Sequence, residues 1–180
     1  VMTDTAQLPF NDHQQTSSGI QKGKTNEYTT GILPSQTIRD LIAIGGIAAQ
    51  QPIPEQQIQP ASIDLRLGVV AYRVRGSFLP GPHSSVRKRL ADFTMHEFEL
   101  TDGAVLEKGC VYVVPLQESL NLSKNISGLA NPKSSTGRLD IFTRVITDYA
   151  SEFDRIPSGY KGGLFAEISP LTFSVKVRTG

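Results

Sequence analysis

Hydroxyl and cationic side chains lie close together between Asn131 and Arg138, where the sequence reads Asn-Pro-Lys-Ser-Ser-Thr-Gly-Arg and two serines are adjacent. The Pro-Lys pair favours a turn, and the serines can open a helical turn whose free backbone N–H groups attract an anion. In such a turn Ser134 and Arg138 are four residues apart and share a face. The segment therefore predicts an anion pocket, and its spacing is equally compatible with a serine-rich helix cap beside a solvated arginine.

Glu167 interrupts an apolar strand, 164–168, that follows a glycine-rich turn with Tyr160 at its tip. Because side chains alternate between the two faces of a strand, the pattern alone favours the solvent face for Glu167. If the side chain pointed inward instead, loss of hydration would favour its protonated form, and a carboxyl group poised nearer neutrality suits a general base. The sequence thus offers one candidate acid–base group and leaves its face open.

A third stretch, residues 59–68, contains the alternation Ile-Asp-Leu-Arg-Leu. Its aliphatic side chains share one face of a predicted half-buried strand, and its charges share the other. Asp64 and Arg66 then lie on the same face, from which they could pair across the sheet. Taken alone, this stretch predicts architecture and no chemistry.

Short strands must position these residues. One helix is expected from Ser35, since apolar residues then repeat at helical spacing until Gly45 and Gly46 end it. The basic stretch 83–89 is expected to be a solvated loop or a subunit contact. Beyond Pro60 the period falls to two, which predicts strands at 63–67, 69–74, 98–100, 111–116, 139–146, 164–168 and 173–177. Many short strands with one clear helix and short helical turns indicate a mostly β sandwich or barrel.

The two ends of the chain differ from its middle. Residues 1–28 are polar and lack apolar periodicity, so they are expected to form a flexible tail before a domain at 29–180. The strand predicted at 173–177 has no returning strand behind it, which would leave one side unpaired. We therefore expect a domain truncated at its C-terminal end, either as the first part of a longer polypeptide or in need of a neighbouring subunit.

Composition argues against several classes of function. The 180 residues carry 18 Lys and Arg against 17 Asp and Glu, a net charge of +1, which gives no field for wrapping nucleic acid or adhering to a membrane surface. No apolar run approaches the roughly 18 residues of a membrane span. Cys110 is the single cysteine and has no partner for an internal disulfide, so a reducing cytoplasm is the expected location.

Three of these stretches together resemble the dCTP deaminases, a family of the trimeric dUTPase-like superfamily. Ala-Ser-Ile-Asp-Leu-Arg-Leu-Gly at 61–68, Lys-Ser-Ser-Thr-Gly-Arg-Leu at 133–139, and Gly-Tyr-Lys-Gly at 159–162 with Glu167 five residues later follow that family's order and approximate spacing. The resemblance covers residues 34–180 and is strongest to the long bacterial form, in which two such domains are joined. It implies a distorted dUTPase-like β-barrel in a homo-oligomer, with trimeric or pseudo-trimeric active sites shared between domains.

The resemblance also implies roles for individual residues. Glu167 falls on the glutamate that activates water for attack on cytosine C4 of dCTP, after which ammonia leaves and dUTP remains. Ser134, Ser135 and Arg138 fall on a Ser-Ser-x-x-Arg motif that touches the triphosphate and organises the water. The other implied substrate-binding residues are Lys133, Thr147 (through its carbonyl, beside the water), Asp148 and Tyr160 (beside the deoxyribose).

The implied chemistry uses no zinc. Zinc-dependent deaminases hold the metal with histidine and cysteine ligands that include a Pro-Cys-x-x-Cys run. Cys110 and the scattered His13, His83 and His96 do not form such a set, so a deaminase made from this chain must use a carboxylate, for which Glu167 is the candidate. Magnesium is expected only as the partner of the substrate's triphosphate.

Several positions depart from the family. Lys133 replaces a usual arginine, Pro157 replaces an aspartate that reads the sugar 3′-hydroxyl, extra residues lie at 149–154, and the segment that closes over the triphosphate is absent. Asp154 and Asp148 are the candidates for the lost hydroxyl contact. Two alternatives stay open: a dUTP diphosphohydrolase or bifunctional enzyme, in which water attacks phosphorus, and a catalytically silent half of a tandem protein that supports the assembly or senses nucleotide.

Overall fold

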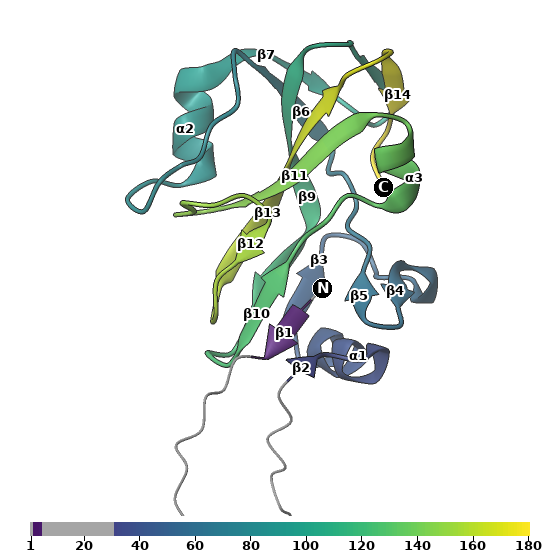
Figure 1. Ribbon diagram of the computed structural model, residues 1–180, viewed down its shortest axis with the longest axis vertical. Helices are drawn as coiled ribbons and strands as arrows, with labels where there is room; N and C mark the ends of the chain where they lie inside the picture. The colour runs from purple at the N-terminus through teal and green to yellow at the C-terminus, as the bar shows by residue number, and fades with distance from the viewer. Residues whose placement is uncertain (1, 5–30) are drawn as a thin grey trace, which may run out of the picture.

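The computed structural model describes residues 2–4 and 31–180, and its largest sheet has six strands that pair only in antiparallel fashion. In order they are β11 (Ile141–Thr147), β13 (Lys161–Pro170), β9 (Val111–Asn121), β6 (Val70–Val74) and β7 (Thr94–Glu99), with β3 (Ile47–Ala49) paired to the far end of β9. Figure 1 shows these strands crossing the middle of the molecule. The predicted mostly β fold is confirmed.

Smaller sheets flank the large one. The four-stranded sheet has the order β12 (Arg155–Ile156), β10 (Ile126–Leu129), β1 (Met2–Asp4), β2 (Gly31–Ile32). Two further pairs are β14 (Val175–Val177) with β8 (Ala104–Leu106), and β4 (Ile58–Gln59) with β5 (Ser62–Ile63). Strand β4 directly follows the 3-10 turn η1 (Glu55–Gln57). The predicted C-terminal strand therefore has a partner on one side. Of the predicted tail, residues 2–4 form β1, and residues 1 and 5–28 lie outside the described residues.

Helix α1 (Ser35–Ala43) begins where the sequence predicts it. Ile38 and Leu41 are buried on its inner face and anchor it to the main core. Gly45 has a φ of +75°, a left-handed conformation that glycine adopts without strain and that commonly ends helices. None of the helices within residues 31–180 is long and apolar enough to span a lipid bilayer.

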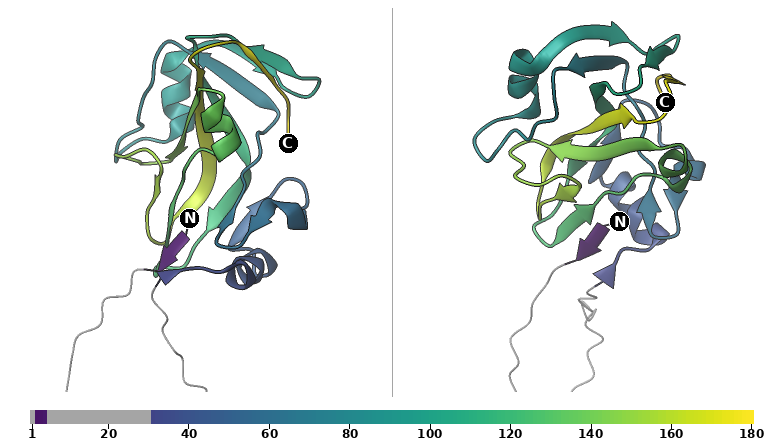
Figure 2. Two further views of the ribbon diagram at one scale, coloured as in Figure 1. Left: turned by 45° about the vertical axis from the view of Figure 1, so that its right-hand side comes forward. Right: turned by 45° about the horizontal axis from the view of Figure 1, so that its top comes forward.

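Helix α2 (Val86–Phe93) corrects the prediction of a solvated basic loop at 83–89. Val86 and Leu90 are buried four residues apart. The three residues between them are basic and hide this apolar spacing in the sequence: Arg87 and Lys88 are exposed, and Arg89 is half-buried. Ser85 caps the helix by accepting a hydrogen bond from the backbone N–H of Lys88 at 3.2 Å. Figure 2 shows α2 at the same end of the molecule as β6 and β7.

The large sheet separates two apolar clusters, and β13 contributes to both. Leu164, Ala166 and Ile168 enter the main core, whereas Phe165 joins a second cluster with Val86 of α2. Because side chains alternate along the strand, Glu167 shares the face of Phe165. The structure therefore directs Glu167 toward the layer that contains α2.

The predicted strand at 63–67 is shorter in the structure, since β5 ends at Ile63. The two charged residues predicted on this strand, Asp64 and Arg66, pair with different partners. Arg66 pairs with the buried carboxylate of Glu118 at 2.9 Å, and Asp64 pairs with Lys133 at 2.5 Å. This stretch therefore ties η1, β9 and the start of the 134–138 segment together.

Gly68 makes a close backbone approach that can be tested. Its N–H donates to the carbonyl of Pro115 at 2.8 Å, and a Cβ atom at this position would lie 2.5 Å from that same oxygen. We expect Gly68→Ala to lower the free energy of unfolding by about 1–3 kcal/mol through overpacking, as measured by denaturant titration. In the matched variant Gly76→Ala, whose Cβ would meet nothing within 4 Å, the change should stay within about 0.5 kcal/mol. Equal stability of the two variants would contradict this account.

Candidate active site around Glu167

Glu167 is buried, with 2% of its surface exposed, so the expectation of a solvent-facing side chain is wrong. It lies on β13 directly between Arg144 of β11 and Val113 of β9. The alternation of side chains predicts that one face of this strand is exposed to solvent. The cluster of α2, Phe78 and Phe165 covers that face instead.

Arg144 is the partner that makes this burial possible. Its guanidinium donates from Nε at 3.1 Å and from Nη2 at 2.7 Å, and both hydrogen bonds end on the same carboxylate oxygen, Oε1 of Glu167. The other oxygen, Oε2, is buried and has no hydrogen-bond partner among the described residues. A buried acceptor left without a donor is uncommon and unfavourable. The carboxylate therefore has one oxygen fixed by the protein and one available to a ligand.

Three further groups hold the guanidinium of Arg144. Ser77 accepts a hydrogen bond from Nη2 at 2.8 Å. The Cζ atom lies 3.5 Å from the ring centroid of Phe153 and 4.8 Å from that of Phe142, so aromatic rings contact the cation. Sequence reasoning missed Arg144, Ser77 and Phe153 as site residues. Only the strand register, which places Arg144 opposite Glu167, could have identified the arginine.

The predicted helical turn at 134–138 is confirmed as α3 (Ser134–Arg138), which leads into β11. Ser134, Ser135 and Arg138 are exposed, and Arg138 has no ion-pair or hydrogen-bond partner in the described part of the chain. Lys133 immediately before the helix is engaged by Asp64. The hydroxyls and the free guanidinium are therefore accessible to an anionic ligand.

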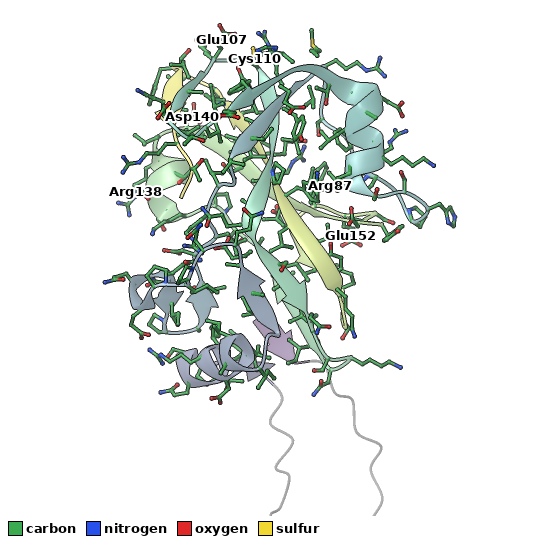
Figure 3. All side chains as sticks on the ribbon, turned by 180° about the vertical axis from the view of Figure 1, so that it is seen from behind. Arg87, Glu107, Cys110, Arg138, Asp140 and Glu152 are labelled. Carbon is green, nitrogen blue, oxygen red and sulfur yellow. The ribbon has the colours of Figure 1, made fainter. Side chains whose placement is uncertain are left out.

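Within this chain the two predicted halves of the site are not brought together. Figure 3 shows Arg138 on α3 and Arg87 on α2 at opposite sides of the molecule, and Glu167 lies on the face covered by α2. No hydrogen bond or ion pair joins Glu167 to Ser134, Ser135 or Arg138 among residues 31–180. A site that uses both halves would need α3 from another domain.

Thr147, Asp148 and Tyr160 lie together where β11 ends and β13 begins. The hydroxyl of Tyr160 accepts from the N–H of Asp148 at 3.1 Å and donates to the carbonyl of Gly163 at 2.7 Å. Burial raises the pKa of Tyr160. The Asp148 carboxylate accepts from the N–H of Val86 at 2.7 Å, at the first residue of α2. Thr147 is buried, and its hydroxyl oxygen has no partner among the described residues.

A cleft of about 410 Å³ lies beside these residues, between β3, β9, β13 and the start of α2. Its lining includes the charged residues Asp148, Arg87 and Glu118, of which Glu118 is buried in its ion pair with Arg66, together with the backbone at Gly163. Glu167 does not line it. Among residues 31–180, no group of three or more His, Cys, Asp or Glu side chains is placed to hold a metal ion, and His13 lies outside the described residues.

Comparisons with known proteins agree with the resemblance. The sequence profile of the 2′-deoxycytidine 5′-triphosphate deaminase (DCD) N-terminal domain matches residues 29–180. A dCTP deaminase of Halorubrum lacusprofundi is 30% identical over 144 residues, 78% of this chain and 67% of that protein. A "dCTP deaminase, dUMP-forming" of Methanobrevibacter smithii is 26% identical over 142 residues, 77% of this chain and 69% of that protein.

A solved structure is similar over most of the chain. The crystal structure of 2′-deoxycytidine 5′-triphosphate deaminase from Agrobacterium tumefaciens matches with a TM-score of 0.81 and 57% sequence identity. The match covers 83% of this chain and 45% of that one. The chain therefore spans less than half the length of that solved protein.

Asp154 gives a pH test of the network around Arg144. Burial, and to a smaller degree the nearby Glu167, raises the pKa of Asp154 above its ordinary 3.8, against the lowering effects of the Val145 N–H and Arg144. A raised folded pKa contributes stability that is fully present below the unfolded pKa and is lost as pH rises through the folded value. We expect the free energy of unfolding of the wild type, minus that of Asp154→Asn, to fall as pH rises from about 3.5 through the folded pKa of Asp154 and then to level off.

The asparagine variant isolates the loss of the titratable group. Its side-chain oxygen can still accept from Val145 N–H, the donor that lies 2.7 Å from the wild-type carboxylate. Asparagine also tolerates the left-handed φ of 61° at position 154. The exposed Asp92→Asn serves as the control. A difference that rises with pH, or one that the control reproduces, would contradict the assignment.

Proposed function

Because the chain belongs to the dCTP deaminase family, we propose that it forms the domain that hydrolyses dCTP to dUTP and ammonia, with Glu167 as the base that activates water. The fold and the residues of the family's motifs support this assignment together. The protein is placed in the cytoplasm in this proposal, as its single cysteine, Cys110, favours.

The observation that carries the proposal is the unpartnered Oε2 of Glu167. Oε1 is held by Arg144, so the carboxylate cannot rotate freely, and Oε2 keeps its lone pairs for a donor that none of the described residues supplies. A water molecule with its two O–H groups is such a donor. A fixed, buried carboxylate oxygen beside a water is the arrangement that a general base needs.

The reaction balances with this one carboxyl group as the proton carrier. Water adds to cytosine C4 as Oε2 of Glu167 takes one of its protons, and the protonated carboxyl delivers a proton to the ring nitrogen N3. The carboxylate, again free, takes the proton of the new C4 hydroxyl and passes it to the amino nitrogen N4. The C4–N4 bond then breaks, ammonia leaves, and the C4 carbonyl of dUTP forms. The sum is dCTP and water giving dUTP and ammonia, with no change of oxidation state.

The triphosphate is assigned to α3. The exposed Ser134 and Ser135 hydroxyls can donate to phosphate oxygens, and the free Arg138 supplies a cation in fork geometry. Lys133 reaches phosphate in this proposal only by leaving Asp64. Magnesium belongs to the substrate, where the triphosphate oxygens are ligands of the kind it prefers. Zinc has no part, since the chain lacks the cysteine and histidine set that the zinc enzymes use.

The separation of α3 from Glu167 within one chain leads us to propose a shared active site in a trimer or pseudo-trimer. Beside α3, a patch of exposed apolar side chains lies on two adjoining segments: Leu139 (50% exposed), Phe142 (43%), Leu171 (49%) and Phe173 (46%). Neighbouring apolar groups of this kind favour contact with another protein surface. A second domain docked on this patch would bring its own Glu167 beside the α3 of the first domain.

A bifunctional activity is the second candidate. The relative from Methanobrevibacter smithii is named as dUMP-forming, which implies that its reaction releases diphosphate as well as ammonia from dCTP. The same site would then also direct water to the α-phosphorus. A catalytically silent role for this half is less favoured, because Ser134, Arg138 and Glu167 are all retained.

The base assignment is tested with Glu167→Gln in the full protein, by measuring ammonia and pyrophosphate separately after addition of dCTP. Glutamine keeps an oxygen for Arg144 but cannot take a proton, so we expect kcat to fall about 100-fold or more with little change in dCTP binding. The exposed Glu99→Gln of β7 is the control and should retain wild-type kcat.

The products separate the candidate functions. Ammonia without pyrophosphate supports the deaminase, and both together support the bifunctional enzyme. Pyrophosphate from dUTP without any deamination would overturn the proposal in favour of a dUTP diphosphohydrolase. An unchanged rate in Glu167→Gln would assign the chemistry to another group.

The shared site predicts complementation between two inactive variants. Arg138→Ala should abolish most activity because it removes the free cation of α3, yet it leaves Glu167 intact. When Arg138→Ala and Glu167→Gln subunits are co-expressed, up to about a quarter of the sites in a randomly mixed cyclic oligomer receive a wild-type residue from each neighbour. Activity should therefore return to the mixed protein and not to either variant alone. Absence of recovery in a mixed oligomer of confirmed composition would place both residues in one subunit's site.

A further inference from the structure

We propose that Arg144 is a positioning residue for Glu167, and that the segment 149–154 holds it in place. This inference rests on the proposed function, because it assigns to Arg144 the task of presenting one oxygen of the base. Both hydrogen bonds from Arg144 end on Oε1, at 3.1 and 2.7 Å. A fork across both carboxylate oxygens would have been the stronger ion pair, and it would have occupied Oε2 as well. The single-oxygen contact fixes the carboxylate and leaves the other oxygen free.

The aromatic contacts limit where the guanidinium of Arg144 can lie. The ring of Phe153 is 3.5 Å from Cζ, close enough for direct contact between ring face and cation, and Ser77 accepts from the same Nη2 that contacts Glu167. The arginine side chain is only 24% exposed. Three neighbours besides Glu167, namely Ser77, Phe153 and Phe142, therefore fix the position of the guanidinium. An arginine fixed independently of its carboxylate partner can orient that partner.

The segment 149–154 supplies the ring. It begins and ends with residues in left-handed conformation, Tyr149 and Asp154, each with a φ of 61°. Asp154 fastens the segment to β11 twice, since its carboxylate accepts from Val145 N–H at 2.7 Å and its own N–H donates to the Val145 carbonyl at 2.9 Å. Its carbonyl also accepts from the N–H of Ala130 at 2.8 Å.

These fastenings explain why the ring of Phe153 meets the guanidinium. Val145 is the residue next to Arg144, so a segment pinned to Val145 must bring the preceding side chain, Phe153, over the arginine. The segment 149–154 thus has a defined task in this inference. It builds a platform for the residue that holds the base.

The test compares Arg144→Met and Arg144→Lys with the wild type in the full protein. Because a misplaced base slows the chemical step more than it weakens binding, we expect Arg144→Met to lower kcat about 10- to 100-fold, with KM for dCTP changed less than about threefold. Arg144→Lys, which keeps one donor for Oε1, should recover part of the lost kcat. Arg73→Met, which removes an ion-paired arginine on β6 of the same sheet, is the matched control and should keep wild-type kcat.

A double variant distinguishes positioning from simple structural support. If Arg144 acts through Glu167, then Arg144→Met should have little further effect on kcat once Glu167 is already glutamine. A structural role would lower the residual activity by the same factor in both backgrounds, and that result would overturn the inference. Phe153→Leu should lower kcat in the same way as Arg144→Met but by a smaller factor, and it gives a readout if Arg144→Met does not fold.

The two levels of the proposal can fail separately. A wild-type protein that releases no ammonia from dCTP would remove the proposed function itself. A deaminase that depends on Glu167 but retains full kcat in both Arg144→Met and Phe153→Leu would leave that function intact and remove the positioning role.

Discussion

A buried carboxylate held by one arginine is the interaction on which the rest of the structure depends. An ionised glutamate inside an apolar layer is strongly unfavourable without a partner, so Glu167 can occupy its place only while Arg144 faces it. That pairing requires the antiparallel register of β11 with β13. It also involves the packing of α2 and Phe78 over the same face of the sheet. The sheet register, the helix and the chemistry of the site are therefore parts of one constraint.

The sequence predicted local features well and long-range ones poorly. Helix α1 and the turn at 134–138 followed from caps and spacing, because the residues that determine them are neighbours in the chain. The candidate base and the hydroxyl and cation motif were assigned through the family pattern, and their roles stay predictions. The face and partner of Glu167 were not, since they depend on a helix, α2, whose apolar spacing is masked by basic residues, and on which residue of β11 lies opposite.

The end of the β11–β13 hairpin links the site to its cover. Asp148 accepts from the first N–H of α2, and its own N–H is held by Tyr160, which in turn donates to Gly163 of β13. A displacement at this hairpin is therefore transmitted to the helix that covers Glu167. The residues that the family pattern associates with the nucleoside are the same ones that fix the cover, so in the proposed enzyme substrate recognition and the cover of Glu167 would share a set of hydrogen bonds.

The buried Oε2 of Glu167, without a hydrogen-bond partner within the residues that the structure describes, is unfavourable for stability, whereas the proposed chemistry requires it. Thermal stability and catalytic turnover would therefore make opposite demands on this residue. Replacing a buried ion pair by well-packed apolar side chains is often neutral or favourable by about 1–4 kcal/mol, so Arg144 and Glu167 are a plausible target for any selection that rewards only a folded chain. Directed evolution toward thermostability, run without an activity screen, would thus tend to replace this enclosed pair of charges. Consensus engineering of the protein should hold those two positions constant and seek its gains on the exposed strands instead.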